Sequence, residues 1–204
     1  MVGEGAHVGP FKLIRTVEEY WEAIHADQFL GSAWCFERPR RLEVNELVSY
    51  IGQLTTDRNG IQSISNIEFV LKIPKIPMSL LDIIIEDFRQ NASIERIFQV
   101  RWDTLAKEYV LVRPTESKES KASINYSFKN IPYHLKPILE IHSHNTMPAF
   151  FSKTDDNDEL LKGFYGVIGN IDQEYPDIKL RVGMEGFFTE ISVEDLFEGG
   201  NANE

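Results

Sequence analysis

The segment from Glu140 to Asp155 constrains this chain more than any other part of its sequence. Two of the five histidines, His142 and His144, lie here with one residue between them, and Asp155 follows after a short loop. Residues two apart on a strand point to the same face, so both imidazoles would project together. Three N/O ligands leave the fourth tetrahedral position of Zn²⁺ for water, as hydrolytic zinc sites require. The alternative for His142 and His144 alone is a pair of strand histidines that only hydrogen-bond; the added acid favours a metal site.

Composition excludes several classes of protein. The chain has 204 residues, of which 42% are hydrophobic, so it suits one domain, or one domain with an elaborated end, that has a real core. A formal net charge of −11 disfavours nucleic acid and anionic membranes as partners. The single Cys35 cannot form an internal disulfide, and its apolar neighbours favour a buried, inert thiol. Without a signal peptide or a membrane-length apolar run, we expect a cytoplasmic protein.

The N-terminal third gives few structural signals. Residues 1–10 suggest a flexible lead, and apolar spacing with a Thr16–Glu19 capping box predicts a helix over 16–30. We expect a strand at 33–36 and a polar turn at 55–60, while 43–51 fits either a helix or a strand.

The remainder has clearer patterns. A strand at 67–73 precedes a helix that we expect to begin at Ser79 as N-cap and to end near Asn91. Strands over 95–102 and 108–113 form a hairpin, and 114–122 is a charged loop. The further expected elements are strands at 123–128, 138–144, 164–169, 179–184 and 186–192, helices at 155–162 and 193–197, and a disordered tail at 199–204.

These residues and this order of elements resemble the JAB/MPN domain, the JAMM metalloproteases, and the bacterial branch of that family in particular. Its pattern is a Glu on the first strand after a long helix, then His-Ser/Thr-His, seven residues, and Ser-x-x-Asp. His142, His144, Ser152 and Asp155 match it at the family spacing. Many relatives have Pro directly after the second His; here that residue is Asn145, which tolerates turn conformations.

The resemblance implies an α/β fold in which helices sandwich a mixed β-sheet, related to cytidine deaminases. It covers residues 67–198, and leaves 1–66 as an N-terminal extension of unknown role. It also implies hydrolysis of a peptide or isopeptide bond after the C-terminal tail of a ubiquitin-like protein. A deaminase needs a Cys-x-x-Cys pair in its zinc site, which one cysteine excludes.

The family pattern assigns Zn²⁺ to His142, His144 and Asp155, and makes Glu95 the general base. By position alone, Glu68, Glu86 and Glu140 are the other candidates for the base, and Glu140 could instead support an imidazole.

Ser152 is a candidate donor to the developing oxyanion, or only a helix cap. Asp156 and Asp158 are alternative ligands without the motif spacing, and His7, His25 and His134 lack ligand neighbours in sequence. Two other functions stay open: a scaffold or binding module of the same fold, and a hydrolase of a small adduct on a carrier protein.

Overall fold

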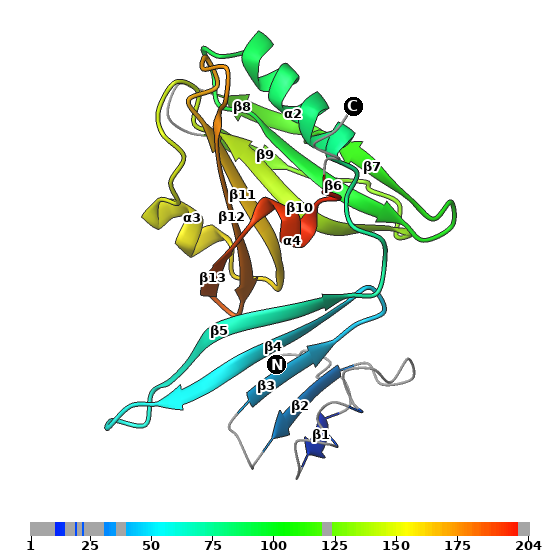
Figure 1. The fold of residues 1–204 in the computed structure, drawn as a ribbon, viewed down its shortest axis with the longest axis vertical. Coiled ribbons are helices and arrows are strands. Elements are labelled where there is room, and N and C mark those ends of the chain that lie inside the picture. Colours follow the sequence, from blue (N-terminus) through cyan, green and yellow to red (C-terminus); the bar gives the residue numbers. More distant parts are fainter. Residues whose placement is uncertain are drawn as a thin grey trace, which may run out of the picture. The chain divides into compact units, whose positions relative to one another are not determined.

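The structure is a computed structural model that describes residues 11–14, 19, 22, 31–35, 40–119 and 124–199 (Figure 1). The chain forms two compact units, one of residues 1–74 with 187–189 and one of residues 75–186 with 190–204. The expected lead over 1–10 lies outside the described residues, as do most of the expected helix over 16–30 and all but Gly199 of the expected tail.

The first unit contains a five-stranded sheet in the order β1-β2-β3-β4-β5. Its first two strands are parallel and the other neighbours are antiparallel. The bounds are β1 (Phe11–Ile14), β2 (Gly31–Cys35), β3 (Arg40–Val44), β4 (Val48–Thr56) and β5 (Gln62–Leu71).

The ambiguous segment 43–51 contains the end of β3 and the start of β4. Asn45 explains the turn between them, because its Oδ1 accepts hydrogen bonds from the backbone N–H of Leu47 and of Val48. The expected strands at 33–36 and 67–73 overlap β2 and β5. β5 spans residue 66 and lies wholly within the first unit. The domain boundary after residue 66 stays a prediction.

A six-stranded sheet in the order β13-β12-β11-β10-β6-β7 dominates the second unit. β10 runs parallel to β11, whereas β10–β6, β11–β12 and β6–β7 are antiparallel, so the sheet is mixed. The bounds are β6 (Ile97–Asp103), β7 (Glu108–Val112), β10 (Leu135–Ser143), β11 (Gly163–Gly169), β12 (Asp177–Met184) and β13 (Phe187–Ile191).

Helices contact both faces of this sheet. α2 (Met78–Gln90) buries Leu81, Ile84 and Phe88, and the Phe88 ring lies 5.8 Å from the ring of Phe98 on β6. Ile141 on β10 pairs with Phe98 and shares this face, so the alternate residue His142 points to the opposite face.

The opposite face carries a shorter helix. Tyr165 on β11 pairs with Glu140 and with Arg181 on β12, which places Arg181 on the face of His142. Arg181 holds α3 (Lys153–Asp158) there through Asp156. The predicted α/β fold, a mixed sheet between helices, is confirmed.

Two expectations for this unit are wrong. The N-cap of α2 is Pro77 and not Ser79; the fixed φ of proline suits a helix start, and the helix begins one residue before Ser79. Part of the expected loop over 114–122 is a strand, β8 (Glu116–Glu119), which pairs with β9 (Ile124–Ser127). Backbone hydrogen bonds form this ladder, so the charged sequence of β8 does not prevent it.

Other elements differ only in their ends. α3 starts at Lys153 and stops at Asp158, and β10 begins three residues earlier than expected and ends at Ser143. The last turn, α4 (Val193–Leu196), precedes Phe197, which bridges to Ile76. Among the described helices, none combines the length and the apolar character needed to cross a membrane.

Candidate metal centre

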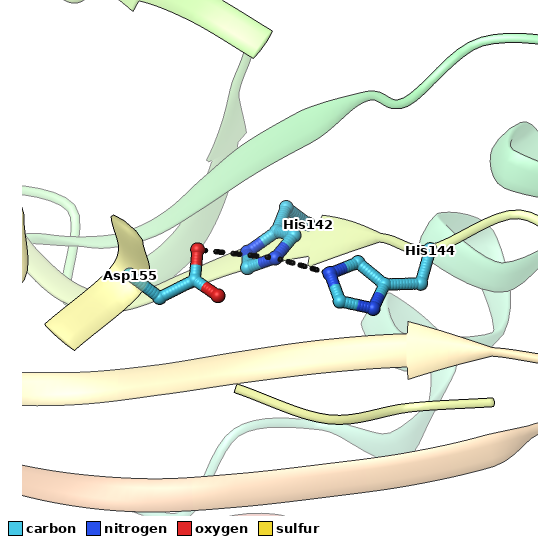
Figure 2. A group of neighbouring side chains, drawn as sticks. All are labelled: His142, His144 and Asp155. Atoms are coloured by element: carbon cyan, nitrogen blue, oxygen red, sulfur yellow. Dashed lines mark hydrogen bonds and ion pairs between the residues drawn. The ribbon is translucent and has the colours of Figure 1, made fainter. Parts of the chain in front are cut away.

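The end of β10 brings the two motif histidines together with Asp155 of α3 (Figure 2). His142 lies on β10, and His144 directly follows the last residue of that strand. The two Nε2 atoms are 3.3 Å apart, and Oδ1 of Asp155 is 3.6 Å from Nε2 of His142. Zinc bonds of about 2.0–2.1 Å in a tetrahedron separate ligand atoms by about 3.3 Å. The three residues therefore fit a single zinc ion, and their ligand atoms all lie within 4.8 Å of one another.

A capping box at the start of α3 orients the Asp155 carboxylate. The backbone N–H of Ser152 donates to Oδ2 of Asp155 over 2.6 Å, and the backbone N–H of Asp155 donates to Oγ of Ser152 over 3.2 Å. With Oδ2 held in this way, Oδ1 faces His142. The local sequence Ser-x-x-Asp thus both starts the helix and aims the third candidate ligand. Ser152 acts as the helix cap in this structure.

Backbone hydrogen bonds fix the loop after His144 to the end of β11. The N–H of His144 donates to the carbonyl of Ile168, and the N–H of Asn170 donates to the carbonyl of Met147. Asn145 has φ 54°, a conformation closed to proline, whose ring holds φ near −65°. At the position where many relatives have Pro, Asn145 therefore adopts a turn conformation that proline cannot reach.

Ser143, between the two histidines, links the metal ligands to the segment of Glu95. Its N–H donates to the carbonyl of Arg96 over 2.9 Å, and its Oγ accepts from the N–H of Arg96 over 3.0 Å. Glu95, the preceding residue, is only 6% exposed. Burial, with the nearby charge of Asp155 adding to it, raises the pKa of Glu95 to about 7. A carboxyl group with such a pKa is poised to exchange protons near neutral pH.

The other candidate bases lie in different surroundings. Glu140 shares the face of His142, and its Oε2 accepts a hydrogen bond from Nε2 of Gln99. Glu86 is exposed on α2 and accepts from Gln90. Glu68 is exposed on β5, in the first unit. Of the four predicted candidates, Glu95 is the one that is both buried and influenced by the charge of Asp155.

Burial keeps both histidines in the form that binds metal. It lowers the pKa of His142 strongly and that of His144 as well, while the charge of Asp155 acts in the opposite direction at both. Neutral imidazoles are therefore favoured at neutral pH, and the neutral ring is the one that ligates a metal. The ring of Phe150 packs against His144 with 4.4 Å between centroids, while 46% of Phe150 stays exposed.

Sequence reasoning missed a buried ion pair beside these ligands. Both Nε and Nη2 of Arg181 donate to Oε2 of Glu159, over 2.8 and 2.6 Å, and Nη1 donates to Oδ1 of Asp156 over 2.6 Å. Burial raises the pKa of Glu159, and the hydrogen bonds and charge of Arg181 oppose that rise. The sequence signal that could have found this ion pair is Arg181, a charged residue inside the apolar run of β12.

The remaining sequence candidates lie apart from the three ligands. Asp156 binds Arg181, and Asp158 is exposed on α3. His134 lies next to the opposite end of β10, where its Nε2 is 4.0 Å from Oδ2 of Asp103. His7, His25 and the Cys35 side chain lie outside what the structure describes.

Comparison with known proteins identifies the family. A family model described as prokaryotic homologs of the JAB domain matches residues 79–182, a span that includes Glu95, both motif histidines and Asp155. No curated protein matches the chain. Among solved structures, the solution structure of a protein from Desulfitobacterium hafniense is 12% identical, with a match that covers 57% of this chain and 88% of that one at a TM-score of 0.40. The family model covers just over half of the 204 residues and confirms the resemblance in the sequence, so the chain belongs to the prokaryotic branch of the JAB domain family.

Proposed function

We propose that this protein is a zinc-dependent peptidase or isopeptidase that hydrolyses the bond after the C-terminal tail of a ubiquitin-like protein. One observation carries the proposal: three ligand atoms spaced for a tetrahedral ion converge in the same unit as a buried Glu95 whose pKa is raised to about 7. Ligands and a proton acceptor are the two parts that metal-assisted hydrolysis needs.

The donor set suits zinc. Two neutral imidazoles and one carboxylate leave one tetrahedral position open, which is the arrangement of catalytic rather than structural zinc sites. Zn²⁺ held by His142, His144 and Asp155 would polarise the scissile carbonyl and lower the pKa of water toward about 7.

Glu95 is proposed to act as the general base and then as the general acid. In the proposed reaction it accepts a proton from the attacking water and delivers it to the leaving amine as the C–N bond breaks. A bound cation lowers the pKa of a nearby carboxyl group, so Glu95 ionises more readily in the zinc-loaded protein than in the metal-free one. Its burial and its link to the ligand strand through Arg96 and Ser143 support this role.

Ser152 is proposed to assist at the carbonyl oxygen. Its Oγ already accepts from the N–H of Asp155, so the hydroxyl hydrogen is left to donate elsewhere. Donation to the developing negative charge is typically worth about 3 kcal/mol.

The substrate assignment comes from the family resemblance. An extended tail can bind by adding a strand to a sheet edge, with main-chain hydrogen bonds for affinity. β7 is an end strand of the described six-stranded sheet, and the turn at 104–107 adjoins it, so these segments are the proposed contributors to tail binding.

The test is cleavage of a ubiquitin-like fusion protein by the purified chain. We expect cleavage that a chelator abolishes and added zinc restores. We expect Glu95→Gln to retain zinc and to lose about 10²–10⁴-fold in rate. Cleavage that persists in chelator or in Glu95→Gln would refute the mechanism, and a wild-type protein that binds no zinc would favour the scaffold function instead.

A further inference from the structure

Arg181 is a buried cation next to the candidate metal centre. Its side chain is 5% exposed, and it lies on the same sheet face as His142. Its guanidinium lies over the ring of Phe151, 3.8 Å from the centroid. Arginine suits such a place because its planar group can stack on a ring and hydrogen-bond in its own plane at the same time.

The partners of Arg181 bracket the third ligand along the chain. Phe151 directly precedes Ser152, the residue that aims the Asp155 carboxylate, and Asp156 directly follows Asp155. Glu159 closes the helix, and its N–H donates to the carbonyl of Asp155. One side chain on β12 thus holds the chain before Asp155, next to it and one turn after it.

Besides Arg181, the described structure holds the α3 segment at its flanks, where the Phe150 ring packs on His144 and Oη of Tyr165 donates to the carbonyl of Leu161. α3 itself has six residues, and none of them is buried. A helix this short is marginal by itself, so its position depends on tertiary contacts. The buried Glu159 at its C-terminal end and the stacked Phe151 before its start are both contacts of Arg181.

We propose that Arg181 is a positioning residue for zinc: it fixes α3 on the sheet so that the Asp155 carboxylate meets the two histidines. The role rests on the proposed metal site and adds a residue that the motif does not contain. Because Arg181 acts through Asp155, its removal should matter only while Asp155 is present.

The experiment is a double-mutant cycle on the affinity for Zn²⁺, measured by competition with a chromophoric chelator. We expect Arg181→Gln to weaken zinc binding by about 10–100-fold, the usual effect of removing a residue that orients a ligand. In the Asp155→Ala background the same change should alter affinity by no more than about twofold. Equal weakening in both backgrounds, or none in either, would overturn the proposal.

A second readout separates this inference from the proposed function. Hydrogen exchange of the metal-free protein should be faster at residues 155–159 in Arg181→Gln than in the wild type, with the β10 and β11 amides unchanged. If the wild type binds no zinc, the proposed function fails, and unchanged exchange at 155–159 would independently refute the role of Arg181.

Two further variants keep the test decisive. Arg113→Gln is the matched control, since it also removes one arginine charge but its partner is Asp87 on α2, on the other sheet face; we expect wild-type zinc affinity and exchange.

If Arg181→Gln does not fold by circular dichroism, Arg181→Lys replaces it. Lysine keeps the charge but has no planar fork, so we expect affinity between those of the wild type and the Asp155→Ala variant. Wild-type affinity and exchange in Arg181→Lys would contradict the proposal.

Discussion

Glu95 and Asp155 are two carboxylates with different surroundings, and the charge of Asp155 acts on Glu95. One oxygen of Asp155 accepts the N–H of Ser152, which leaves the other oxygen facing His142. Glu95 is buried, and its pKa is raised to about 7. These surroundings suit Asp155 to the role of ligand and Glu95 to the role of base.

The raised pKa of Glu95 predicts a pH-dependent change in stability. The folded pKa of Glu95 lies above the value of about 4.5 usual for glutamate, so the folded state holds the proton longer, and ionisation costs stability as pH rises from about 5 to 7. In metal-free protein, Glu95→Gln should therefore gain stability relative to the wild type across this range, measured as the difference in Tm at each pH. The comparison removes one ionisable group and leaves both buried histidines in place in the two proteins. A Tm difference that does not change between pH 5 and 7.5 would contradict the raised pKa.

Single residues were predictable from the sequence where their spacing is local. His142, His144 and Asp155 lie within one short segment, and their ligand atoms converge in the structure. Arg181 was not predictable in this way, since its partners Asp156 and Glu159 precede it by 25 and 22 residues. Only the fold brings β12 to α3.

At the scale of elements, the loop over 145–149 depends on a glycine of β11. A Cβ at Gly169 would collide with the carbonyl oxygen of Met147 and the backbone N of Ala149. Neither is the end of a flexible side chain, so the loop itself would have to move. The close approach explains why glycine occupies the end of this strand.

Gly169→Ala is therefore expected to displace the loop and weaken zinc binding by about tenfold or more, measured by chelator competition. The matched control is Gly163→Ala in the same strand. Its Cβ would meet only the end of the Tyr165 side chain at 3.9 Å, so we expect wild-type affinity. Similar affinities for both variants would show that the loop does not position His144.

Elements were predictable where their periodicity is strong. The apolar face of α2 and the alternation of β6 and β7 give a helix and a hairpin at the expected places. β8 was missed because its charged sequence has no apolar alternation, whereas the backbone pairs it antiparallel with β9. The cap of α2 was misplaced because the helix begins at Met78, so Ser79 already lies inside its first turn.

At the scale of the molecule, the three candidate ligands all belong to the second unit. Ligand binding stabilises the folded state by about 4 kcal/mol when the free ligand exceeds its Kd a thousandfold. For a protein of this size, that corresponds to a rise in Tm of about 10 °C. We expect calorimetry to show such a rise with zinc in the wild type, and none in a variant with both His142→Ala and His144→Ala.

His142, His144 and Asp155 are proposed to hold one zinc ion and to leave its fourth position open. X-ray absorption spectroscopy on protein loaded with one equivalent of zinc tests this proposal most directly. We expect four N/O neighbours at about 2.0–2.1 Å, two of them imidazoles, and the loss of one imidazole in His142→Ala. A sulfur neighbour at about 2.3 Å, or a spectrum that His142→Ala leaves unchanged, would contradict the proposal.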